Sequence, residues 1–139
     1  MKRVFLSFVE QDAPKVKNLL ALLSGPDYDL DFYEGLFDMD FDAPGAQTIK
    51  RAIGEKITKC SIAVCLISEN THNSKWVNLQ LEKNLNKGNR IIAMALKGTV
   101  DVVLPAVVRQ ENLTFYPWDP VRLKKLIVED TSKLFNNSL

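Results

Sequence analysis

The chain has few of the residues that build metal centres, disulfides and histidine-based catalysis. Among its 139 residues are two cysteines and one histidine. Cys60 and Cys65 lie five apart at the start of an apolar run, where a regular strand would direct them to opposite faces. A disulfide or a shared metal is therefore not expected. The sole histidine, His72, excludes multi-histidine metal sites and any triad that needs a second histidine. We expect no metal site.

Long apolar runs and a strong net charge are also absent. No apolar run approaches the ~20 residues that span a bilayer, and acidic and polar residues at 10–12 end the first apolar stretch before signal-peptide length. A formal net charge of +1 gives no field that would recruit nucleic acid or an acidic membrane. The length suits one domain over 1–139. We expect a cytoplasmic protein that binds neither nucleic acid nor membranes.

The apolar patterns predict strands that alternate with helices. Strands are expected at 3–8, 28–33, 61–67, 90–96 and 113–116. Helices are expected with Pro14 in the first turn of the first one, around 49–57, from about Ser74 to Gly88 and at 120–134, with an irregular segment or short helix at 102–108. The expected buried side of the last helix is Val121, Leu123, Leu126 and Ile127. This alternation predicts an α/β fold. The most suitable architecture is a flavodoxin-like three-layer domain, a five-stranded parallel sheet of order 2-1-3-4-5 flanked by helices.

Residues 61–82 carry the most information about function. They read as a buried strand, a polar loop and a helix with two distinct faces. Val77, Leu81 and Leu85 form an apolar stripe, and Trp76 and Gln80 form a second stripe beside it. In the predicted sheet order, ligands bind where the first and third strands end. Ser7 and Phe8 end the first strand and Ser68 follows the third, so these residues are expected to face the same crevice as Trp76 and Gln80.

Several chemistries are excluded at this crevice. The chain has no GxxxxGK(S/T) loop and no GxGxxG after the first strand, so a glycine-cradled nucleotide phosphate is not supported. A receiver domain would need acidic residues where Ser7, Phe8 and Ser68 stand. An isolated Trp-x-x-x-Gln pair is more often a packing tryptophan and a solvated glutamine. The long loop at 34–45 offers Phe37 and Phe41, which would gate a substrate, mediate assembly or fold back on the core.

Three segments carry a resemblance to a known family. RVFLSF, DAPGAQTIKRAIGEKITKCSIAVCLIS and THNSKWVNLQLE are similar to the TIR superfamily, most closely to the bacterial TIR-like proteins of the Thoeris antiphage defence system. The third segment matches the pattern Thr-x-x-Ser-x-Trp-Val-x-x-Glu except at its last position, which holds Gln80. In catalytic TIR domains that position is the glutamate required to cleave NAD. A natural pseudoenzyme and a deliberately introduced substitution both fit this difference.

The resemblance implies a function and a set of site residues. NAD would be a substrate, with no cofactor, and its product, a cyclic ADP-ribose isomer or an ADP-ribose conjugate, would activate a partner effector protein. Gln80 would hold the catalytic position, and the substrate-binding residues would be Ser7, Phe8, Tyr33, Phe37, Ser68, Thr71, Ser74 and Trp76. Because an amide cannot carry the carboxylate's charge, we expect impaired catalysis. A non-catalytic TIR scaffold that forms a homo-oligomer and a flavodoxin-like sensor are the alternatives.

Overall fold

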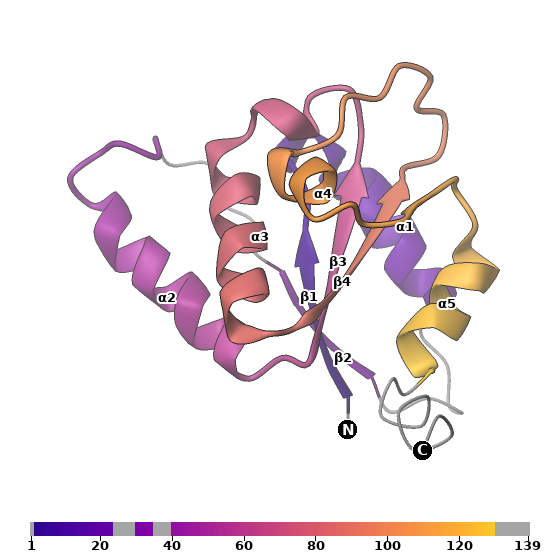
Figure 1. Ribbon diagram of the computed structural model, residues 1–139, viewed down its shortest axis with the longest axis horizontal. Coiled ribbons are helices and arrows are strands. Elements are labelled where there is room, and N and C mark those ends of the chain that lie inside the picture. Colours follow the sequence, from indigo (N-terminus) through magenta and orange to yellow (C-terminus); the bar gives the residue numbers. More distant parts are fainter. Residues whose placement is uncertain (1, 24–29, 35–39, 130–139) are drawn as a thin grey trace.

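A parallel sheet forms the centre of the protein. The computed structural model describes residues 2–23, 30–34 and 40–129. The strands are β1 (Lys2–Ser7), β2 (Leu30–Glu34), β3 (Ile62–Ile67), β4 (Arg90–Ala95) and β5 (Phe115–Tyr116). All neighbouring pairs are parallel, and the order is β2-β1-β3-β4-β5 (Figure 1). The α/β architecture and the strand order expected from the sequence are therefore both present.

Helices cover both faces of the sheet. They are α1 (Ala13–Leu23), α2 (Ala46–Thr58), α3 (Lys75–Lys87), α4 (Ala106–Gln110) and α5 (Pro120–Val128), with short 3-10 turns η1 (Glu10–Asp12) and η2 (Thr71–Asn73). The core cluster on one face joins the strands to α1 and α5. Two clusters on the other face join them to α2, α3 and α4. No helix within the described ranges is both long and apolar enough to cross a bilayer.

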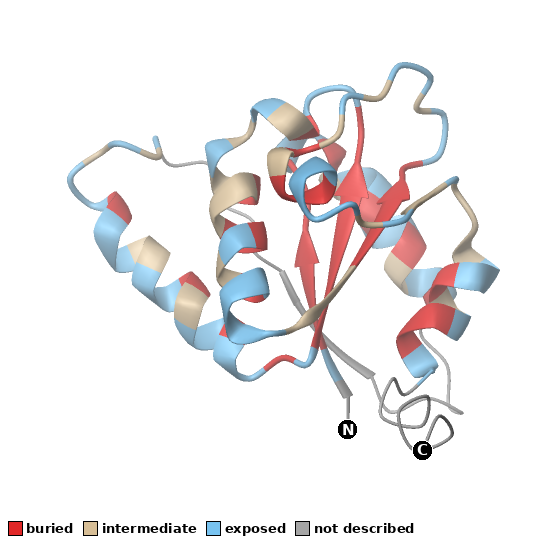
Figure 2. Cartoon of the chain, in the orientation of Figure 1, coloured by how far each residue is buried: buried red, intermediate tan, exposed pale blue. Residues whose placement is uncertain are grey.

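The buried stripes of two helices differ from the prediction. On α3, Leu85 is 36% exposed and Asn84 is fully buried. Positions i, i+4 and i+8 drift by about 40° per step around a helix, so Leu85 has rotated away from the sheet while Asn84 lies almost in line with Val77. On α5, Val121 is 68% exposed because the sheet-facing stripe is Leu123, Leu126 and Ile127. Figure 2 shows this division into buried and exposed helix faces.

The two cysteine thiols are reduced and buried. Burial raises the pKa of the Cys65 thiol to about 12, so only about one thiol in ten thousand would be ionised at pH 8. The Cys60 thiol donates a hydrogen bond to the carbonyl of Lys56 at 3.3 Å. We expect neither thiol to react with iodoacetamide at pH 8 in the folded protein, and both to react in denaturant, as read by mass spectrometry. Rapid adducts on the folded chain would contradict this burial.

Candidate functional site

Gln80 and Ser7 meet at the carboxyl end of the central strands. Ser7 is the last residue of β1 and pairs with Cys65 of β3. Its Oγ donates a hydrogen bond of 2.6 Å to Oε1 of Gln80, 73 residues further along the chain. Both residues are fully buried. The structure thus brings Ser7 to Gln80, as expected, and the alternative of a solvated helix glutamine is wrong.

The start of α3 is determined by a cap that the sequence predicted. Ser74 is the N-cap, and its Oγ accepts a hydrogen bond of 3.1 Å from the backbone N–H of Val77. At the other end Gly88 adopts a left-handed conformation with φ of 90°, which glycine tolerates without steric cost. The cap places Gln80 in the second turn of α3, on the side that faces the sheet. The Ser74 hydroxyl, predicted to contact substrate, is already engaged in this cap.

A buried polar chain continues from Gln80 along α3. Nδ2 of Asn84 donates to the backbone carbonyl of Gln80 at 2.9 Å, and Nδ2 of Asn89 donates to Oδ1 of Asn84 at 2.9 Å. Buried amides need such partners, because an unpaired one costs about 1–3 kcal/mol. Asn84 was not among the residues predicted for this site. Its position seven residues after Val77, on the buried stripe, was the signal that could have identified it.

Aromatic side chains gather beside Gln80, one helical turn earlier. Trp76 is half-buried and meets Phe41 edge to face, with ring centroids 5.0 Å apart and planes at 76°. The Lys50 ammonium lies 3.7 Å from the centre of the Phe41 ring. Phe41 was predicted to gate a substrate, mediate assembly or fold back on the core, and in the structure its ring packs against Trp76. Aromatic residues in a long loop were the signal for it.

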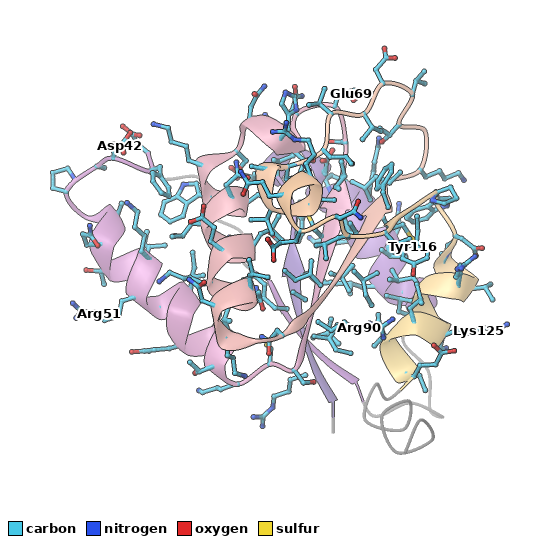
Figure 3. All side chains as sticks on the ribbon, viewed as in Figure 1. Asp42, Arg51, Glu69, Arg90, Tyr116 and Lys125 are labelled. Carbon is cyan, nitrogen blue, oxygen red and sulfur yellow. The ribbon has the colours of Figure 1, made fainter. Side chains whose placement is uncertain are left out.

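An ion pair holds the end of the same loop to α3. Nζ of Lys75 lies 2.8 Å from Oδ2 of Asp42, and Figure 3 shows Asp42 in the loop that precedes α2, beside the first turn of α3. The ammonium of Lys75 holds the pKa of the Asp42 carboxyl below its usual value. Both side chains are largely exposed, so the pair contributes little to stability. It does restrict where residues 40–45 lie relative to Trp76.

A second polar cluster closes the loop after β3. The Ser68 hydroxyl donates to Oδ2 of Asp12 at 2.6 Å, and the Ser68 backbone N–H donates to Oγ1 of Thr71 at 2.8 Å. All three residues are buried. Their hydrogen bonds tie η1, before α1, to the loop that leads into α3. Ser68 and Thr71 therefore stabilise this loop, whereas the prediction for them was contact with substrate.

Of the predicted substrate-binding residues, Phe8 points away from Gln80, and the side chains of Tyr33 and Phe37 lie outside the described part of the chain. Phe8 is 3% exposed and belongs to the core cluster of α1 and α5, because successive residues of a strand point to opposite faces and Ser7 points the other way. Tyr33 lies in β2, where its backbone pairs with Phe5, but its side chain is outside the described part. Phe37 is also outside the described residues.

The site offers hydrogen bonding without charge. The carboxamide of Gln80 carries one acceptor oxygen and two donor hydrogens, and it cannot ionise. Glu82 is exposed, on the far side of α3, and Glu69 is exposed on the loop after β3 (Figure 3). No group of three or more histidine, cysteine or acidic residues that could hold a metal ion occurs among the described residues. The arrangement can orient polar groups of a ligand, but it supplies no anion of its own at Gln80.

Comparisons with known proteins agree with this fold. A solved structure described as a 2-deoxyribosyltransferase from Bacillus psychrosaccharolyticus superposes with a TM-score of 0.63 at 16% identity, covering 95% of each chain. At that identity the likeness concerns the fold alone. No curated protein matches the sequence. Residues 5–101, more than half of the chain, match the family described as Thoeris protein ThsB, TIR-like domain. The chain therefore belongs to the Thoeris ThsB TIR-like domain family.

Proposed function

We propose that this chain is an NAD-cleaving TIR-like enzyme of antiphage defence whose activity is lowered because Gln80 occupies the catalytic glutamate position. The observation that carries the proposal is the buried contact between Gln80 and Ser7 where β1 and β3 end. Ligands of open parallel sheets bind at such a point. Family membership supports an antiphage role, and the position of Gln80 in the motif supports NAD as the substrate.

The chemistry assigned to this position is cleavage of the bond between the nicotinamide nitrogen and C1′ of its ribose. The bonding electrons leave with nicotinamide, which becomes neutral, and positive charge develops on the ribose. A ribose hydroxyl or water then adds to C1′ and releases a proton. A carboxylate would accept hydrogen bonds from the ribose hydroxyls and stabilise the developing charge. The Gln80 amide retains the acceptor oxygen but not the charge, so binding is expected to survive better than catalysis.

Access to Gln80 requires movement in its surroundings. Its side chain is fully buried, and Trp76 and Phe41 pack against each other one turn away. A nucleotide that stacks on Trp76 would replace the edge contact between Phe41 and Trp76 with a contact between its own ring and Trp76. The ion pair between Lys75 and Asp42 restrains the same loop from the surface. We infer that NAD binding displaces Phe41, and that the product passes to a partner effector as a nucleotide signal.

The proposal is tested by following NAD with the purified chain and with its Gln80→Glu variant, separating substrate and products by chromatography. The parent chain is expected to consume NAD slowly and the variant faster. Absence of turnover by the variant, even with phage lysate added as a trigger, would overturn the enzyme proposal in favour of a scaffold. The lysate is heated before use to destroy its own NAD-consuming enzymes, and heated lysate without the chain serves as the blank.

Trp76 provides an independent check on where the substrate lies. In the Gln80→Glu background, Trp76→Ala is expected to lower kcat/KM for NAD by about tenfold or more, because a stacking platform for the substrate is lost. Trp76 also packs against the core cluster of α2. Trp76→Phe, which keeps a ring, and thermal melts of each variant separate substrate contact from general unfolding. Unchanged kinetics in a folded Trp76→Ala variant would place the site elsewhere.

A further inference from the structure

A cavity lies on the opposite face of the sheet from Gln80. Its volume is about 240 Å³, and its lining includes Lys15, Asn18 and Leu22 of α1, Lys97 after β4 and Trp118 before α5. Leu19 of α1 belongs to the core cluster that joins the sheet to α1 and α5, and Trp118 packs against that cluster. Gln80, by contrast, lies on α3, whose buried leucine and valine belong to a cluster on the other face. The two sites are therefore separate.

The polar groups that line this cavity are mainly hydrogen-bond donors without acidic partners. Nζ of Lys15 has a single long contact, 3.5 Å, to the backbone carbonyl of Lys97. Within residues 2–23, 30–34 and 40–129, neither lysine pairs with a carboxylate, and neither the Asn18 amide nor the Trp118 indole N–H makes a hydrogen bond. Among the described residues that line the cavity there is no aspartate or glutamate. Two cations and two neutral donors around one space favour an anion.

The backbone restricts where these groups stand. Lys97 occupies a tight turn in which the N–H of Thr99 donates to the carbonyl of Leu96 at 3.1 Å. Gly98 completes the turn with φ of 84°, a left-handed conformation that other residues rarely adopt. Across the cavity, Asp119 caps α5 by accepting a hydrogen bond of 3.0 Å from the N–H of Arg122, which positions the preceding Trp118. In Figure 3, Tyr116, two residues earlier, lies beside α5. The cationic and aromatic walls thus come from separate, anchored elements.

The apolar part of the lining determines what kind of anion fits. Trp118 is partly buried, and Leu22 is 61% exposed beside the cavity. An indole and a leucine side chain offer a surface on which a flat ring can stack. The volume is slightly below the range of about 300–1,000 Å³ usual for drug-sized ligands. It therefore suits one ring system with one anionic group better than a dinucleotide.

We propose that this cavity is a second ligand site, separate from the NAD site, for a nucleoside monophosphate. The base lies against Trp118 and Leu22, and the phosphate lies between Lys15 and Lys97. The site involves no catalysis. It stands independently of the function proposed for Gln80, because none of its lining residues belongs to that site.

Fluorescence of Trp118 provides the test. The chain has two tryptophans, so Trp76→Phe leaves Trp118 as the single reporter. Titration with AMP at low salt is expected to quench this signal. Lys15→Ala and Lys97→Ala are each expected to weaken AMP binding by about threefold to tenfold, and the double variant further, since each removes a partly solvated ion pair with the phosphate. Raising the salt concentration should weaken binding as well.

A matched control lies on the same helix. Lys17 is exposed and does not line the cavity, so Lys17→Ala should bind AMP as the parent does. Adenosine and inorganic phosphate, which each carry half of the ligand, should bind at least about tenfold more weakly than AMP. The proposal is overturned if millimolar AMP causes no quenching, if both lysine variants bind like the parent, or if adenosine binds as well as AMP.

Calorimetry of AMP binding to the full chain and its lysine variants gives the same answer should Trp76→Phe not fold. It also separates the two proposals. Loss of NAD turnover in the Gln80→Glu variant combined with intact, lysine-dependent AMP binding would overturn the enzyme proposal alone. NAD turnover by the Gln80→Glu variant without lysine-dependent AMP binding would overturn the second site alone.

Discussion

Replacing Gln80 with glutamate is expected to raise the rate of NAD cleavage by roughly tenfold to a thousandfold. The physical reason is that a carboxylate at this buried position would stabilise the positive charge that develops on the ribose, and burial excludes the water that would otherwise screen it. Ser7 is already in place to orient the new group, since its Oγ lies 2.6 Å from Oε1 of Gln80. Initial rates of NAD loss measured by chromatography provide the comparison.

Glu82 provides a control on the same helix. It is exposed and lies about 200° around α3 from Gln80. Glu82→Gln, made in the Gln80→Glu background, removes one carboxylate without touching the site, so its rate should equal that of the single variant. If Glu82→Gln lowered the rate by as much as Gln80→Glu had raised it, the charge would act through the overall field of the helix and not through contact with substrate.

The same substitution predicts a particular dependence on pH. Burial disfavours a charged carboxylate, so the pKa of the new carboxyl group should lie above the ordinary glutamate value of about 4.3, while the Ser7 hydrogen bond offsets part of this rise. A carboxyl group whose folded pKa is raised binds its proton more tightly in the folded state. The variant should therefore lose stability relative to the parent as pH rises above about 4.3, until its folded pKa is passed. Activity should rise over the same range, because the carboxylate is the active form. Thermal melts and rates across pH test both.

Leu81→Ala is expected to lower the free energy of unfolding by about 2–5 kcal/mol. Leu81 is fully buried in the cluster that joins α3 to the sheet, so truncation removes packed methyl groups and leaves a cavity. A loss of this size is a large fraction of the roughly 5–15 kcal/mol that stabilises a typical domain. Urea denaturation followed by circular dichroism provides the measurement.

Leu85→Ala is the matched control. The same chemical change one turn further along α3 affects a side chain that is 36% exposed, so it should cost less than about 1 kcal/mol. Both substitutions leave the helix propensity almost unchanged, because leucine and alanine are both good helix formers. Equal losses at the two positions would mean that the helix is rotated relative to the sheet and that Asn84 is not on its buried side.

The contrast between Leu81 and Leu85 shows which features of α3 can be predicted from the periodicity of apolar residues. Residue spacing predicted that α3 exists and that Trp76 and Gln80 form a stripe beside an apolar one, and the polar residues before it predicted a start near Ser74. It did not predict that Asn84 would be buried while Leu85 is exposed. A hydrophobicity pattern assigns polar residues to the surface, and a buried amide is tolerated only because specific partners satisfy it. The partners of Asn84 are the Gln80 carbonyl and Asn89, which the pattern does not reveal.

Some contacts between distant segments could be predicted from the sequence and others could not. The strand order implied that Ser7 and Gln80 would meet, because the order of a parallel sheet determines which strand ends are neighbours. Phe8 was assigned to the same crevice, yet the alternation of side chains along β1 sends it into the core. The edge contact between Phe41 and Trp76 depends on the path of a loop, and loop paths follow from packing and not from local pattern.

The sequence by itself determined the α/β class, the order of the sheet, the cap of α3 and the presence of an amide, Gln80, in the Trp-Val-x-x-Gln segment. These features depend on local spacing, on capping chemistry and on a motif that is continuous in the chain. Only the tertiary structure decided that Gln80 is fully buried against Ser7 and that Lys15, Lys97 and Trp118 surround one cavity. Burial and convergence depend on how elements far apart in the chain pack together, and that geometry is a property of the whole fold.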